Sequence, residues 1–133
     1  IGESSMIGIL ILTHEDLGEH LIRCASHVVG MKPPQLMHLS VFPHDDPDTV
    51  LSRASALIKQ LDSGDGVLVL SDIFGATPCN IASRLVQTGK VECVAGVNLP
   101  MLVRALTYRN EPLPVVIEKG LSGGQGGVIH VND

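Results

Sequence analysis

Two polar residues with the potential for chemistry each follow an apolar run of strand length. His14 comes after "ILIL" (residues 9–12) with only Thr13 between, and Asp72 comes after "VLVL" (67–70) with only Ser71 between. Ligands of open parallel sheets bind beyond the carboxyl ends of the strands, and a doubly wound sheet commonly sets its first and third strands side by side. We therefore expect the imidazole and the carboxylate to meet. The carboxylate would orient the ring by accepting a hydrogen bond from one nitrogen, leaving the other as a nucleophile.

The segment "DIFGATPCN" (72–80) predicts an anion-binding turn beside that pair. Gly75 and Ala76 permit a tight turn that aims backbone N–H groups at an anion. Thr77 adds a hydroxyl at the start of a helix, where the helix dipole favours negative charge. The segment contains no lysine or arginine. Such a cradle would hold a phosphoryl group loosely enough to pass it on.

Each of these residues also has a simpler interpretation. His14 is explained as a polar loop residue, Asp72 as the cap of a turn, and Thr77 as the start of a helix. The acids after His14, at positions 15 and 16, are explained as first-turn residues favoured by the helix dipole. What favours the chemical interpretation is that His14, Asp72 and Thr77 converge on one edge of the predicted sheet.

No metal or nucleotide site is expected elsewhere. His20, Cys24 and His27 share a helical face, but Cys24 falls within an apolar stripe, which favours a core thiol flanked by histidines over a metal site. The glycine-rich residues 120–127 lack the GK[ST] ending of a phosphate loop. We therefore predict that the chain holds no metal and no cofactor.

The composition is that of a globular protein and excludes several classes of partner. The chain has 133 residues, of which 44% are hydrophobic, 17% charged and 2% aromatic, and its net charge is −5. Few rings and a negative charge disfavour nucleic-acid binding. No apolar run approaches the ~20 residues of a membrane span. Three cysteines without CxxC spacing favour a reduced, cytoplasmic protein. We expect one domain over residues 6–133, with residues 1–5 a remnant of expression.

Strand and helix patterns alternate four times along the chain. Apolar runs of strand length occupy residues 6–12, 36–42, 66–70 and 91–97, and helical patterns occupy residues 16–29, 47–61, 77–88 and 98–110. This alternation predicts an α/β fold with an open, mainly parallel sheet of four strands and helices on both faces. Residues 120–127 are expected to be a flexible hinge. Residues 128–131 are expected to form an edge strand that pairs with its own sheet or with a neighbouring subunit.

Three motifs together resemble a known family. "GILILTHEDLGEHLI" (8–22), "GVLVLSDIFGATPCNIASRL" (66–85) and "VAGVNLPML" (94–102) are similar to segments of the mannose-class IIA domain of the bacterial phosphoenolpyruvate-dependent sugar phosphotransferase system. The resemblance implies a phosphotransferase in which His14 accepts a phosphoryl group from phospho-HPr and passes it to a IIB component. It implies that Asp72 orients His14, and that the family's homodimers often exchange the final strand.

The resemblance also implies further site residues. The expected phosphate contacts are Thr13, Gly75, Ala76 and Thr77, and the expected partner surface comprises Phe74, Asn98, Pro100 and Met101. Two positions depart from the family pattern: Ile73 replaces a common threonine or serine, and Phe74 replaces a frequent tryptophan. Because no IIB domain follows residue 133, an alternative function stays open, a regulatory module whose partner binding is switched by phosphorylation of His14. A third hypothesis, an α/β ligand-binding domain without a covalent step, also stays open.

Overall fold

Four parallel strands form one sheet in the order β2–β1–β3–β4. The computed structural model describes residues 6–132, so the predicted remnant at residues 1–5 lies outside the described residues. The four predicted strands are confirmed, although the first one runs two residues later than predicted, so that His14 is its last residue, and the last one ends two residues early. The strands are β1 (Gly8–His14), β2 (Leu36–Val41), β3 (Val67–Ser71) and β4 (Val91–Ala95).

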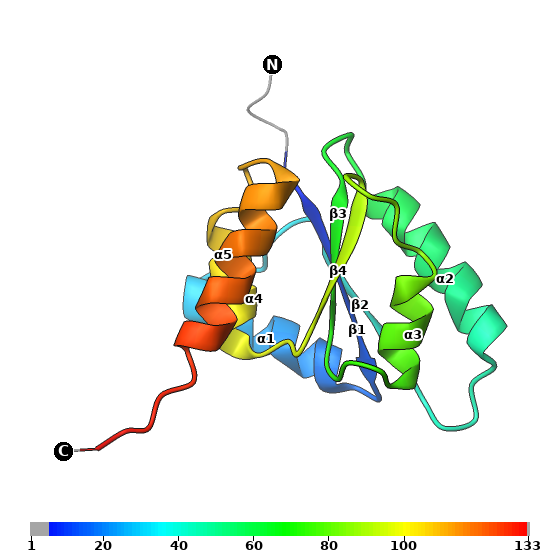
Figure 1. The fold of residues 1–133 in the computed structure, drawn as a ribbon, viewed down its shortest axis with the longest axis horizontal. Helices are drawn as coiled ribbons and strands as arrows, with labels where there is room; N and C mark the ends of the chain where they lie inside the picture. Colours follow the sequence, from blue (N-terminus) through cyan, green and yellow to red (C-terminus); the bar gives the residue numbers. More distant parts are fainter. Residues whose placement is uncertain (1–5, 133) are drawn as a thin grey trace.

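Helices cover both faces of the sheet, as the alternating pattern predicts. Figure 1 shows α1, α4 and α5 on one face and α2 and α3 on the other. Every helix except α1 has a proline at one of its first two positions. The fixed φ and the missing N–H of proline suit the first turn of a helix. The helices are α1 (Leu17–Val29), α2 (Pro47–Leu61), α3 (Thr77–Ser83), α4 (Leu99–Thr107) and α5 (Leu113–Gly126).

The central strands β1 and β3 are apolar along nearly their whole length because both of their faces are covered. Ile9 and Ile11 of β1 belong to the core under α1, α4 and α5, whereas Leu10 and Leu12 belong to the core under α2 and α3. All four side chains are fully buried. Since side chains alternate between faces along a strand, two hydrophobic layers hold β1 and β3 in fixed positions. The residues that follow these strands are positioned with the same precision.

Helix α1 buries only part of the apolar stripe that its sequence predicts: Ala25 is buried and Leu21 packs against the core, but Leu17 and Val28 are exposed. Its buried residues are Gly18, Ile22 and Ala25, whereas Cys24 is exposed. The interpretation of Cys24 as a core thiol is therefore wrong. Gly18 and Ala25 are small, and a Cβ atom at Gly18 would lie only 3.2 Å from Ile11 Cγ2. The helix thus packs close to the sheet through its smallest residues, and apolar periodicity alone does not reveal such a face.

The expected flexible hinge at residues 120–127 is wrong, because residues 120–126 belong to α5. Glycines on this helix face α4 at very short range. A Cβ atom at Gly123 would lie 2.6 Å from Arg104 Cβ, and one at Gly124 would lie 2.7 Å from Met101 Cε. Glycine lowers helix propensity, but here it lets two helices approach more closely than any side chain allows. The glycine-rich pattern therefore marks a helix–helix contact.

The segment after α5 is extended and forms no strand among the described residues. Val128, Ile129 and Val131 expose 76%, 70% and 87% of their surface, and Figure 1 shows the segment leading away from the sheet. The expected edge strand is therefore not formed within the chain, and its pairing with another subunit stays a prediction. Within residues 6–132, no helix combines the length and apolar character needed to cross a membrane.

Candidate active site

His14 and Asp72 meet at the carboxyl edge of the sheet. β1 and β3 are neighbours in which Leu12 pairs with Ser71, so the next residues of both strands emerge side by side. The Asp72 Oδ2 atom lies 2.9 Å from His14 Nδ1 and accepts a hydrogen bond of 3.1 Å from the His14 backbone N–H. The carboxylate therefore holds both the ring and the main chain. With Nδ1 bonded, Nε2 is the ring nitrogen that is available for chemistry.

The electrostatics of Asp72 favour an ionised carboxylate. Burial by itself would raise the pKa of Asp72, but hydrogen bonds from the His14 ring and from backbone amides outweigh it and hold the pKa below its ordinary value. The Asp72 side chain is 9% exposed, whereas the His14 side chain is 44% exposed. The pair is therefore a shielded anion that orients an imidazole open to approaching molecules.

A cavity of about 530 Å³ lies over His14. Thr77 borders it at the start of α3, and Glu15 borders it in the turn between β1 and α1. The remaining wall comes from the end of β2 and the connection to α2: Val41, Phe42, Pro43, Asp45 and Pro47. Among the described residues, no lysine or arginine lines this cavity, and the carboxylates that border it are those of Glu15 and Asp45.

The predicted phosphate cradle is only partly assembled around this cavity. Thr77 is exposed and borders the cavity, and Gly75 adopts the left-handed φ of +85° that its turn requires. Ala76 leads into α3 from an extended conformation. Thr13 is different: it is fully buried, and its Oγ1 accepts a hydrogen bond of 2.9 Å from the Gly18 N–H. The expected phosphate contact from Thr13 is therefore wrong, because this hydroxyl is committed to the start of α1.

The residues expected on a partner surface separate into two groups. Phe74 is 85% exposed and Pro100 is also exposed. Asn98 instead caps α4 by accepting from the Met101 N–H at 2.9 Å, and its Nδ2 donates to the Gly124 carbonyl at 3.1 Å. Met101 is only 4% exposed. The expectation that Met101 belongs to the surface is wrong, because its side chain packs between α4 and α5.

Several residues of the cavity were not anticipated from sequence. Phe42 and Asp45 come from the connection after β2, and the Asp45 Oδ2 accepts a hydrogen bond of 2.8 Å from the Phe42 N–H. β2 is the other neighbour of β1, so its carboxyl end also reaches the crevice. The rule that placed His14 and Asp72 at this edge also applies to the end of β2. The position of Phe42 and Asp45 just after a predicted strand is therefore the sequence signal that could identify them.

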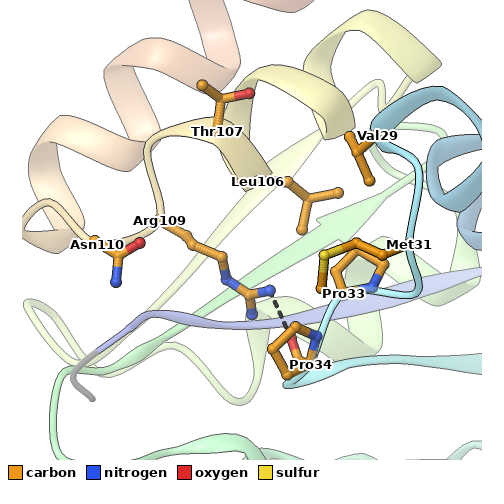
Figure 2. Close-up of a pocket in the computed structure, with 8 residues that line it drawn as sticks. All are labelled: Val29, Met31, Pro33, Pro34, Leu106, Thr107, Arg109 and Asn110. Atoms are coloured by element: carbon orange, nitrogen blue, oxygen red, sulfur yellow. Dashed lines mark hydrogen bonds between the residues drawn. The ribbon is translucent and has the colours of Figure 1, made fainter. Parts of the chain in front are cut away.

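A separate cavity of about 360 Å³ lies at the opposite, amino end of the sheet. Arg109 borders it, and Figure 2 shows its guanidinium directed toward Pro34. The guanidinium donates to the carbonyls of Ile7, Pro34 and Gln35, and burial lowers the Arg109 pKa to about 10. These bonds connect the segments that enter β1 and β2. The role of Arg109 is therefore structural, far from His14.

The described residues contain no cluster of three or more His, Cys, Asp or Glu side chains arranged to hold a metal ion.

The fold and the edge on which His14 and Asp72 meet define a small α/β protein of the open parallel-sheet class, with a histidine–aspartate pair at the ends of adjacent central strands. The sequence model of the family described as "PTS system fructose IIA component" (EIIA-man) matches residues 8–114. The chain belongs to this family, the mannose-type IIA components of the sugar phosphotransferase system.

Individual relatives agree with this family. The chain is 33% identical over 124 residues to the mannose-specific EIIAB component of Escherichia coli K12, covering 88% of this chain but only 38% of that protein. It is 30% identical over 105 residues to the fructose-specific EIIA component of Bacillus subtilis, covering 78% of this chain and 71% of that protein. The mannose/sorbose-specific IIA subunit of Enterococcus faecalis shares the fold, with a TM-score of 0.86 at 22% identity over 97% of both chains.

Proposed function

We propose that this protein is a cytoplasmic phosphocarrier that accepts a phosphoryl group on His14 from the phosphohistidine of HPr and passes it to a IIB component. The observation that carries the proposal is the 2.9 Å contact between His14 Nδ1 and Asp72 Oδ2, on an imidazole that is 44% exposed. A carboxylate in this position selects one tautomer, with the proton on Nδ1 and the lone pair on Nε2. Membership in a family of phosphotransferase-system IIA components supports phosphoryl transfer as the chemistry of this pair.

In the proposed transfer, the Nε2 lone pair attacks the phosphorus of the donor. The donor's N–P bond breaks as the new N–P bond forms, and its electron pair stays on the donor nitrogen. The positive charge that develops on the His14 ring is stabilised by the ionised Asp72, which keeps its hydrogen bond to Nδ1–H. Transfer to the IIB component repeats these steps with His14 as the donor. The carrier itself needs only orientation and charge stabilisation.

The cavity over His14 is the proposed place of the phosphoryl group. Thr77 borders it and would donate its hydroxyl to a phosphoryl oxygen, with the N–H groups of the turn at Gly75 and Ala76 as further donors. Phe42, Ile73 and Phe74 expose 47%, 58% and 85% of their surface near the same edge. Exposed apolar side chains of this size are typical of docking surfaces. We propose that they contact the two partner proteins in turn.

Phosphorylation with the isolated components tests this proposal. Phosphoenolpyruvate, enzyme I and HPr should add the mass of one phosphoryl group to the wild-type chain, and acid should remove it. The His14→Ala variant should stay unmodified while keeping its fold by circular dichroism. His20→Ala is the matched control, because His20 is an exposed histidine of α1 and should leave the modification intact. A wild-type chain that stays unmodified, or an His14→Ala chain that is modified equally, would contradict the proposal.

We also propose that the chain forms homodimers through residues 128–131. β4 is an outer strand of the sheet and offers an edge for pairing with another strand. The apolar side chains of residues 128–131 are exposed within one chain, so burying them against a second copy would be favourable. Light scattering should give a dimer for the whole chain and a smaller species when the chain is truncated after Gly127. Equal masses for the two proteins would contradict this arrangement.

A further inference from the structure

The residue after His14 has an unusual backbone conformation for its type. Glu15 has a φ of +47°, the left-handed region, and only two non-glycine residues among those described have a positive φ. The conformation is fixed on both sides: the His14 N–H donates to Asp72, and the Glu15 N–H donates to the Val41 carbonyl at 2.9 Å. α1 begins at Leu17, so the chain must turn within two residues. The turn therefore dictates the conformation.

The turn does not dictate the residue. Glycine adopts this conformation without a steric penalty, whereas a residue with a Cβ atom is strained by about 1 kcal/mol. Within residues 6–132, the Glu15 carboxylate has no hydrogen-bond or ion-pair partner that would offset the strain. The other residue of this kind, Gln35, has one, because its Nε2 donates to the Leu61 carbonyl. A strained residue without a structural contact at the candidate site points to a functional role.

The position of the Glu15 side chain suggests that role. It borders the same cavity as His14, together with Asp45, and no basic side chain borders this cavity. Asp45, unlike Glu15, is held in place by a hydrogen bond, since its Oδ2 accepts from the Phe42 N–H. A phosphoryl group on Nε2 would bring roughly two negative charges into the cavity that Glu15, the residue next to His14, also borders. The carboxylate therefore repels the phosphorylated state more than the free state.

We propose that Glu15 raises the phosphoryl-transfer potential of phospho-His14, so that the equilibrium favours passing the group onward. This inference rests on the proposed phosphocarrier function. The transfer itself is unchanged: one N–P bond breaks, one forms, and the Nδ1 proton stays with Asp72. Only the relative free energy of the two phosphorylated proteins changes. Since Glu15 is exposed, salt screens its effect.

Equilibrium measurements on two variants separate charge from strain. Glu15→Gln removes the charge and keeps the Cβ atom, whereas Glu15→Gly removes both. Each protein is incubated with phospho-HPr freed of enzyme I, and the phosphorylated fractions of both proteins are measured by intact mass once they are constant. The equilibrium constant is independent of docking rates. Glu19→Gln is the matched control, because Glu19 is an exposed acid of α1 outside this cavity.

Both Glu15 variants should shift the equilibrium toward the phosphorylated IIA protein by about 3- to 10-fold, and high salt should reduce the shift. Glu19→Gln should match the wild type. Only Glu15→Gly should also raise thermal stability. An equilibrium for Glu15→Gln equal to that of the wild type would overturn the inference while leaving the phosphocarrier function intact. A wild-type protein that accepts no phosphoryl group would overturn both.

Discussion

A single oxygen atom of Asp72 binds both the ring and the backbone amide of His14, at 2.9 Å from Nδ1 and 3.1 Å from the backbone nitrogen. The two residues are 58 positions apart, and the pairing of β1 with β3 brings them together. Asp72 Oδ1 in turn accepts a hydrogen bond of 3.1 Å from the Ile73 N–H. The carboxylate is thus held in place by the segment just after β3 while it orients the imidazole at the end of β1. Changes to Asp72 should therefore affect reactivity before they affect the fold.

The Asp72→Asn variant should slow phosphorylation of His14 by at least roughly 10- to 100-fold, the loss found when the carboxylate partner of a metal-binding histidine is removed. An amide can also donate to Nδ1, so it accepts the wrong tautomer and leaves the developing positive charge unstabilised. Single-turnover transfer from phospho-HPr measures the rate. Asp65→Asn is the control, because Asp65 is an exposed acid just before β3, at the other end of the sheet. Equal rates for wild type and Asp72→Asn would exclude Asp72 from the transfer.

Asp72 should also contribute to stability in a pH-dependent way. Burial opposes ionisation, but the hydrogen bonds from His14 and the backbone hold the pKa of Asp72 below its ordinary value. The folded state therefore binds this proton less readily than the unfolded state does. The stabilisation is fully present well above the pKa of the unfolded state and is lost as the pH falls through the folded-state pKa. Urea unfolding of wild type and Asp72→Asn should show a stability difference that shrinks between neutral pH and about pH 3. A difference that grows on acidification would contradict this sign.

Much of the fold and the centre of the site could be predicted because the signals are local. Continuous apolar runs identify buried parallel strands, and Asp46 followed by Pro47 marks the beginning of α2, whose predicted bounds are confirmed. The adjacency of His14 and Asp72 follows from one topological rule applied to these strands. The histidine–aspartate geometry needs no information beyond strand order and strand ends.

The sequence-based predictions that the structure contradicts concern features that depend on tertiary packing. Glycine signals flexibility in isolation, yet Gly123 and Gly124 are helical because α4 lies against them. Thr13 precedes His14, but successive side chains of a strand point to opposite faces, so the Thr13 hydroxyl faces α1 and is bonded there. Cys24 follows the apolar period of α1, yet the helix packs through smaller residues. Tertiary contacts decided each of these cases.

Replacing Arg109 by methionine should destabilise the protein by about 3 kcal/mol or more. The guanidinium donates to the carbonyls of Ile7, Pro34 and Gln35, and methionine would leave these acceptors without their charged donor. Arg109→Lys should recover only part of the loss, because an ammonium group cannot reproduce the planar fork. Chemical denaturation measures both. Arg104→Met is the control: Arg104 is exposed over the Tyr108 ring, and its loss should cost less than about 1 kcal/mol. Equal losses for Arg109→Met and Arg104→Met would contradict the structural role of Arg109.

Two glycines of α5 should respond differently to alanine: one substitution should destabilise the protein and the other should not. A Cβ atom at Gly123 would lie 2.6 Å from Arg104 Cβ and 3.3 Å from the Pro100 carbonyl oxygen, so Gly123→Ala must push α4 and α5 apart. The expected net loss is about 1–2 kcal/mol, after the better helix propensity of alanine is included. At Gly126, the last residue of the same helix, a Cβ atom would meet nothing within 4 Å. Gly126→Ala should therefore be neutral or stabilise by up to about 1 kcal/mol. Thermal and urea unfolding of the two variants separate helix propensity from packing, since propensity alone would move both in the stabilising direction.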